Sequence, residues 1–378
     1  MRDTLRTSEG SRFIVFGSAV SAVSSLYFLV LPVVLGAAGR TGNWDETELG
    51  SIASAYLLFF TVAGAASAGF NAIFRAKLIR ALPCFFLGGG FGIAALQSQN
   101  LNMVMLGHAL AGIGAGALYS VSFNLVAASK NAGNGFGWKL TAEQALGASG
   151  FLLLSGLALS FAGMMAVLAA FCFLAGTILV FAPYEKIIEK AATKSSAFEH
   201  GWRFLLALAA VGIFMGALSG IWAFLEQFST EAGVSVQAFG YIGFASLILG
   251  GGGGMAAGLL GDRFGNGKPL IFSAIILVFI IIGLATVSAI PVIGGALAFP
   301  LLWNFTMAYQ LAIASNLDPA NRYVGWLSPT VAGGATLGPL GAGFLLAGNA
   351  TFIPLLTVTA IIAIGALMLS ANLSRAAD

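Results

Sequence analysis

Charged side chains are scarce in this sequence. Asp, Glu, Lys and Arg make up 8% of its 378 residues, whereas 58% of the residues are hydrophobic. A water-soluble surface normally needs about 25% charged residues. Histidine and cysteine are also rare: the chain has only His108 and His200, and Cys84 and Cys172. This composition argues against a soluble enzyme, a disulfide framework and a metal cluster. We expect neither enzymatic activity nor a cofactor.

Long apolar runs take the place of the missing charge. A helix that crosses a bilayer needs roughly 20 mostly apolar residues. Twelve such runs follow one another, at 13–36, 48–70, 81–98, 101–129, 141–162, 164–183, 203–226, 236–260, 269–288, 290–315, 323–347 and 350–373. The sequence therefore predicts an all-α membrane protein with twelve transmembrane helices.

The basic residues lie on one side of this series of runs. Every Lys and Arg except Arg40 falls near a terminus or in an even-numbered loop. Cytoplasmic loops of membrane proteins retain Lys and Arg. We therefore expect a bacterial-type inner membrane protein with both termini in the cytoplasm and Arg40 in a periplasmic loop. The net charge of +3 reflects this topology and does not indicate a nucleic-acid partner.

The two halves of the chain repeat each other at an offset near 190 residues, as Gly50 of the second run matches Gly240 of the eighth. This offset predicts two six-helix bundles, 1–183 and 203–378, joined by a cytoplasmic linker at 184–202. Glycines at every fourth position predict close helix contacts, as at Gly212, Gly216 and Gly220.

The most specific motif follows the eighth run. The segment GLLGDRFGNGK, which starts at Gly258, resembles the signature Gly-x-Leu-Ala-Asp-Arg-x-Gly-Arg-Lys of the major facilitator superfamily. Gly258, Leu260, Asp262, Arg263 and Gly265 fall in register. The resemblance implies the fold of that family (MFS) and transport by alternating access. It also implies that Gly258, Asp262, Arg263 and Gly265 form a gating motif; the alternative is a solvated turn.

Other motifs of the family are altered. Ile73 and Phe74 stand where the matching first-half loop would have its Asp and Arg. His108 replaces an Arg that the family associates with proton coupling, and the fifth run lacks the Gly-Pro of antiporters. The resemblance therefore does not establish the coupling scheme or the direction of transport.

Polar and aromatic side chains recur at helical spacing in four of the runs. In transporters of the family, the corresponding helices line the substrate cavity. The candidate substrate contacts are therefore Tyr27, Tyr119, Trp222, Trp303, Asn304, Met307 and Gln310. The alternative for each is a hydrogen bond between helices or an aromatic ring facing lipid.

Ionisable groups inside apolar runs cost roughly 2.5–3.5 kcal/mol to insert, which makes them functional candidates. His108, Glu143 and Glu226 are such groups, and we expect them to carry coupled protons. The alternative is that both carboxylates lie at the membrane interface and that His108 packs through a hydrogen bond.

No Lys or Arg is expected near mid-membrane, so a phosphate or dicarboxylate would lack its usual partner. We expect a monomeric secondary active transporter in the lipid bilayer. It would carry a small organic solute that is neutral, aromatic or weakly acidic, coupled to protons. Alternatives are an uncoupled facilitator, a multidrug efflux pump and a transporter-like sensor that moves nothing.

Overall fold

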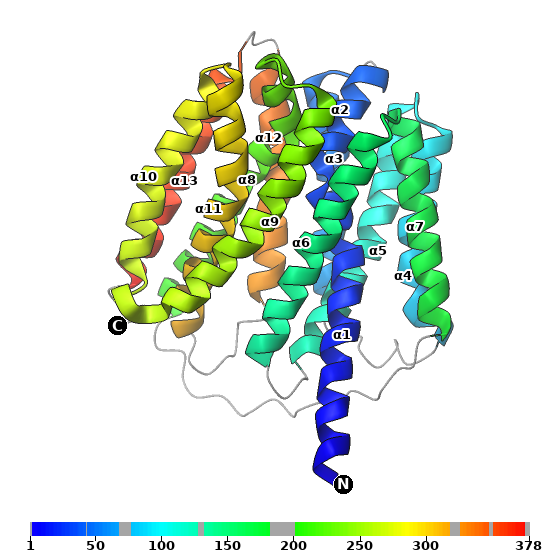
Figure 1. Cartoon of the computed structure of the whole chain (residues 1–378), viewed down its shortest axis with the longest axis horizontal. Coiled ribbons are helices and arrows are strands. Elements are labelled where there is room, and N and C mark those ends of the chain that lie inside the picture. Colours follow the sequence, from blue (N-terminus) through cyan, green and yellow to red (C-terminus); the bar gives the residue numbers. More distant parts are fainter. Residues whose placement is uncertain are drawn as a thin grey trace. The chain divides into compact units, whose positions relative to one another are not determined.

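A computed structural model describes residues 2–42, 44–67, 77–127, 132–181, 201–317, 326–347 and 351–374. Side chains of 2–13, 77–80, 124, 127, 132–137 and 262 lie outside this description. So do most of the expected linker, which includes residues 184–200, and the first-half loop with Ile73 and Phe74. The described parts are helical, with short turns (Figure 1).

The described helices of the first half are α1 (Arg2–Leu29), α2 (Leu31–Gly42), α3 (Glu46–Ser67), α4 (Lys77–Leu96), α5 (Leu101–Ala127), α6 (Ala132–Gly156) and α7 (Phe161–Phe181). The break between α1 and α2 precedes Pro32, which has no N–H to continue the helical ladder. Together α1 and α2 form one apolar span, Ile14–Gly42.

In the second half the helices are α8 (Gly201–Glu231), α9 (Val236–Leu260), α10 (Gly267–Ala285), α11 (Ala289–Asn316), α12 (Leu327–Leu346) and α13 (Ile353–Ser374). A 3₁₀ turn, η2 (Gly261–Phe264), joins α9 to α10. Pro300 and Pro339 lie inside α11 and α12.

The described chain contains nine spans that are long and apolar enough to cross a membrane. The remaining three of the twelve transmembrane helices are α4, whose apolar part is shorter, α6, which contains charged residues, and the glycine-rich α12. Side chains that face outward are apolar, as α10 shows with Phe272, Ile275, Phe279 and Ile282. An all-α membrane protein with twelve transmembrane helices follows, because such a surface suits hydrocarbon and not water.

The helices pack into two compact units. Unit 1 comprises residues 1–37 and 55–191, and unit 2 comprises residues 38–54 and 192–378. Within unit 1, α1 packs on α5 and α6, and α4 packs on α5 and α7. Within unit 2, α8 packs on α11 and α12, and α10 packs on α11 and α13. These four pairings join helices at equivalent positions of the two halves of the chain.

Glycines set the closest of these contacts. A Cβ on Gly338 would lie 2.3 Å from the carbonyl oxygen of Gly216, and one on Gly334 would lie 2.2 Å from that of Gly212. The glycine pattern of these runs therefore lets the backbones of α8 and α12 touch.

Candidate functional site

A buried ion pair lies on α6 of unit 1, and we call it the α6 pair. The Nζ atom of Lys139 is 2.6 Å from the Oε1 atom of Glu143, one helical turn further on. The Lys139 and Glu143 side chains are only 1% and 8% exposed. The hydroxyl of Ser21 on α1 donates a hydrogen bond to the same carboxylate oxygen. Burial of two charges is tolerated because each meets an opposite or polar partner.

Two aromatic rings of α5 complete the surroundings of Lys139. Its Nζ atom lies 4.2 Å from the ring centroid of Tyr119 and 4.1 Å from that of Phe123. These are cation–π distances, which favour the charged form of the amine. The ring of Phe60 on α3 lies 5.3 Å from that of Tyr119 and extends the aromatic strip. Lys139 is thus held by one carboxylate and two ring faces.

His108 lies in a second cluster of unit 1, which is mostly aromatic. Its ring centroid is 5.2 Å from that of Tyr27, 6.1 Å from that of Phe91 and 6.2 Å from that of Phe161. The Nδ1 atom is 2.8 Å from the carbonyl oxygen of Val104, so the proton sits on Nδ1. Neither His108 Nε2 nor the Tyr27 hydroxyl has a hydrogen-bond partner among the described residues.

Unit 2 contains a different ion pair, which we call the α2–α8 pair. The Nη1 atom of Arg40 on α2 donates to the Oε1 atom of Glu226 on α8. Arg40 is 42% exposed, whereas Glu226 is 1% exposed. The second carboxylate oxygen of Glu226 has no hydrogen-bond partner in the described structure. This pair therefore joins a buried, half-satisfied acid to a solvated base.

Two serines of the same unit form hydrogen bonds to the backbone of α12 beside Pro339. Pro339 cannot donate a hydrogen bond to Ala335, and the hydroxyl of Ser219 on α8 donates to that carbonyl at 3.1 Å. Ser54 on α3 receives the Leu340 N–H at 3.1 Å and donates to the Thr336 carbonyl at 2.7 Å. The Ser54 hydroxyl thus replaces one rung of the α12 ladder, as at kinks where a side chain enters a helix.

The expected substrate contacts of the second half form hydrogen bonds to neighbouring groups. Trp303 donates to the sulfur of Met215 at 3.1 Å, and Gln310 donates to the Ser370 hydroxyl at 3.1 Å. The Asn304 amide donates to the Pro300 carbonyl on its own helix at 3.1 Å. Trp222 and Met307 are buried on α8 and α11. The oxygen of the Gln310 amide has no partner in the described residues.

The signature motif falls at the end of α9. Gly258 lies in its last turn, Arg263 lies exposed in η2, and Gly265 has a φ of +67°. Such a left-handed backbone favours glycine, which explains that position of the motif. The Tyr309 hydroxyl donates to the Gly261 carbonyl at 3.2 Å and ties this turn to α11. The side chain of Asp262 lies outside the described residues.

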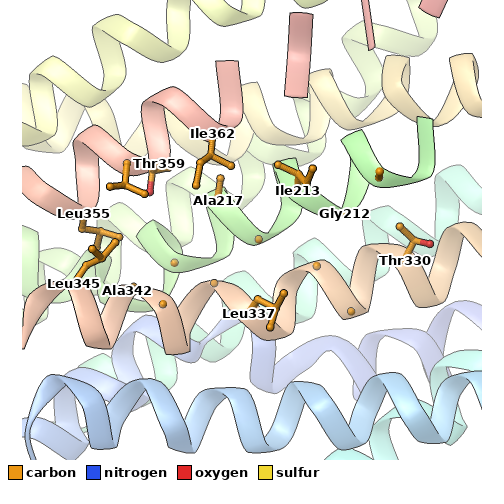
Figure 2. Close-up of a pocket in the computed structure, with 18 of the residues that line it drawn as sticks. Gly212, Ile213, Ala217, Thr330, Leu337, Ala342, Leu345, Leu355, Thr359 and Ile362 are labelled. Carbon is orange, nitrogen blue, oxygen red and sulfur yellow. The ribbon is translucent and has the colours of Figure 1, made fainter. Parts of the chain in front are cut away.

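A groove of about 650 Å³ lies among α8, α12 and α13 (Figure 2). Its walls are glycines and apolar side chains, with Thr330 and Thr359 as its polar members. None of the expected site residues lines it. Several lining side chains are exposed, including Ile213 and Leu337. Such an apolar groove suits contact with lipid. Its two threonine hydroxyls are few polar groups to orient an organic solute.

Comparison with known proteins places the chain in a family. The model of the Major Facilitator Superfamily matches residues 13–320, so the chain belongs to this family of membrane transporters. No curated protein sequence matches it.

Two solved structures share the fold. A bacterial homologue of the human lysosomal transporter Spinster, inward-facing and unoccupied, is 14% identical with a TM-score of 0.70, over 98% of this chain and 95% of that one. A variant of the nucleoside transporter NupG is 14% identical with a TM-score of 0.71, over 97% of this chain and 99% of that one.

Sequence reasoning missed two basic residues of these sites. The sequence predicts the fifth apolar run at 141–162, which puts Lys139 in a loop. In the structure α6 begins at Ala132 and includes Lys139. The signal was present, since Lys139 and Glu143 are four residues apart, the spacing of helical ion pairs. Arg40 was singled out only as the exception to the charge pattern. The acid that it meets, Glu226, is 186 residues away in sequence.

Proposed function

We propose that this protein is a proton-coupled secondary active transporter that moves a small organic solute across the inner membrane by alternating access. The observation that carries the proposal is the α6 pair. Glu143 is buried and bonded to Lys139 and Ser21, so a proton on Glu143 would weaken its ion pair and change what Lys139 can bind. A residue shared by a proton site and a substrate site couples them, because each ligand then changes the affinity for the other.

Several further assignments belong to this proposal. His108 and Glu226 are the other candidate proton carriers, and Tyr27, Tyr119, Trp222, Trp303, Asn304, Met307 and Gln310 are the candidate substrate contacts. The chain would act as a monomer with cytoplasmic termini. Its bundles would be 1–183 and 203–378, with a linker at 184–202. Gly258, Asp262, Arg263 and Gly265 would form the gating motif.

The α2–α8 pair includes a residue from a segment that sequence and packing assign to different domains. Residues 38–54 belong to the proposed N-terminal bundle by sequence but pack in unit 2, against α8 and α12. If the bundles are those proposed, then Arg40, Glu226 and Ser54 form contacts that alternating access has to break and remake. The proposal therefore assigns the α2–α8 pair to the conformational change and the α6 pair to the chemistry of coupling.

The test is solute-driven proton movement in liposomes that contain the purified protein and a trapped pH indicator. Sugars, aromatic amides and monocarboxylates are added one at a time without a membrane potential. We expect at least one class to cause a change in internal pH, beyond that in protein-free liposomes. Solute uptake without proton movement would indicate an uncoupled facilitator. Neither uptake nor proton movement with any class would contradict transport.

A further inference from the structure

We propose that Lys139, with the ring faces of Tyr119 and Phe123, binds the carboxylate of a monoanionic substrate, and that Glu143 releases Lys139 by taking up a proton as the substrate enters. This inference deepens the proposed function and rests on it. It also narrows the expected substrate class, from a neutral, aromatic or weakly acidic solute to a monocarboxylate.

The first step of the argument is the availability of Lys139. An ammonium group has three N–H donors; one is used by the carboxylate oxygen of Glu143 and one by the Tyr119 phenol, which leaves the third for another acceptor. The Tyr119 and Phe123 rings, at 4.2 and 4.1 Å, would still stabilise the cation after the carboxylate of Glu143 has become neutral. Lys139 can therefore stay charged while it exchanges one carboxylate for another.

The second step is charge balance. The α6 pair carries no net charge in its described state. A proton added to Glu143 would leave one uncompensated positive charge at a site where Lys139 is 1% exposed, and such a charge is costly to bury. A bound monoanion restores neutrality, so the proton and the anion should each favour binding of the other. A dianion would leave a net negative charge and is disfavoured.

The third step concerns the groups that face the pair. From α1 the structure places the Ser21 hydroxyl on Glu143, and from α5 it places the Tyr119 phenol and the Phe123 ring on Lys139. Among the described side chains around the pair, Tyr119, Lys139 and Glu143 are the titratable groups. Glu143 supplies the carboxylate of this set, so the proposal places the added proton on Glu143.

The fourth step concerns the rest of the substrate. Phe60, Tyr119 and Phe123 form a continuous aromatic strip, with adjacent ring centroids 5.3 and 5.0 Å apart, and all three are half-buried. Rings of this kind contact apolar and aromatic bodies favourably. The class of substrate is therefore a monocarboxylate with an apolar or aromatic body.

The test is equilibrium binding to the purified full-length protein in detergent. Benzoate, phenylacetate and cyclohexanecarboxylate are compared with benzamide, the neutral analogue of benzoate, by thermal stabilisation and calorimetry. We expect carboxylates to bind and benzamide not to bind. Binding should take up about one proton per anion, so the affinity should fall about tenfold for each pH unit in the alkaline range.

Four variants make the result specific. Glu143→Gln should bind benzoate without proton uptake and without pH dependence, and Lys139→Gln should lose binding. Lys139→Gln leaves a buried unpaired acid, which destabilises the fold. The double variant Lys139→Gln/Glu143→Gln removes that acid and should fold. It should also lose benzoate binding. Arg203→Gln is the matched control, since Arg203 is a half-exposed base over the Trp202 ring, and it should bind as the wild type does.

The proposal is overturned if the double variant binds benzoate as tightly as the wild type. It is also overturned if wild-type binding takes up no proton, or if no carboxylate of the panel stabilises the protein. Failure of the proposed function would look different: carboxylates would bind with proton uptake, but no solute would move protons into liposomes.

Discussion

The α6 pair and the α2–α8 pair hold a buried glutamate in contrasting ways. In the α6 pair both partners come from one helix, both are buried, and Ser21, Tyr119 and Phe123 surround them. In the α2–α8 pair the partners come from distant segments, Arg40 is 42% exposed, and one oxygen of Glu226 is unsatisfied. In the α6 pair, Lys139 could exchange Glu143 for another anion without moving its helix. In the α2–α8 pair, Arg40 and Glu226 could separate when their segments move apart.

The largest expected change in the free energy of unfolding is at Lys139. Lys139→Ala leaves Glu143 buried without its cation, and it should lower the free energy of unfolding by about 3–5 kcal/mol. Unfolding of the purified protein in mixed detergent micelles measures this value. The double variant Lys139→Leu/Glu143→Leu, which removes both charges and keeps apolar volume, should recover most of the loss. No recovery would mean that the pair does not act as a unit.

A smaller effect is expected at Arg40, because its guanidinium already contacts water. Arg40→Gln should lower the free energy of unfolding by about 1–2 kcal/mol at neutral pH. The loss should shrink as the pH falls, because a proton on Glu226 removes the unpaired buried charge. Thermal unfolding across a pH series checks this trend.

The control for Arg40 lies on the same helix as its partner. Glu231 is an exposed acid five residues after Glu226, and Glu231→Gln should not lower the free energy of unfolding at neutral pH. Equal pH dependence in Arg40→Gln and the wild type would show that Arg40 does not neutralise Glu226.

The smallest effect concerns the ring faces of the α6 pair. Tyr119→Leu removes one cation–π contact and should cost about 0.5–2 kcal/mol. Tyr119→Phe keeps the ring face and loses the phenol that also meets Lys139, so it should cost less than Tyr119→Leu. If both substitutions destabilise equally, the hydroxyl and not the ring supports Lys139.

Most of the fold could be predicted from the sequence because hydrocarbon demands long apolar helices and cytoplasmic loops retain charge. All twelve predicted runs correspond to described helices, and the eighth run matches α9 (Val236–Leu260) at both ends. A large boundary error is at α6 (Ala132–Gly156), predicted at 141–162. Its first two turns contain Gly, Asn and Lys, which lower hydropathy although the segment is helical.

The sites could be predicted only in part. Hydropathy and spacing identified Glu143, Glu226 and His108 as unusual, because a buried ionisable group stands out in an apolar run. Lys139 and the Val104 carbonyl are local partners, four residues from Glu143 and His108. The other partners depend on tertiary packing, which brings Ser21 to Glu143 across 122 residues and Arg40 to Glu226 across 186. No local pattern in the sequence encodes such contacts.

The measurement that tests the central claim most directly compares accumulation with exchange in proteoliposomes, for a solute that moves protons with the wild type. Glu143→Gln should lose proton-driven accumulation at least tenfold, by about 1.4 kcal/mol or more of driving force, yet retain gradient-free exchange. Glu226→Gln should change accumulation and gradient-free exchange together, since the α2–α8 pair is assigned to the conformational change that both processes require. Full accumulation by Glu143→Gln, or its loss only in Glu226→Gln, would contradict the assignment of coupling to the α6 pair.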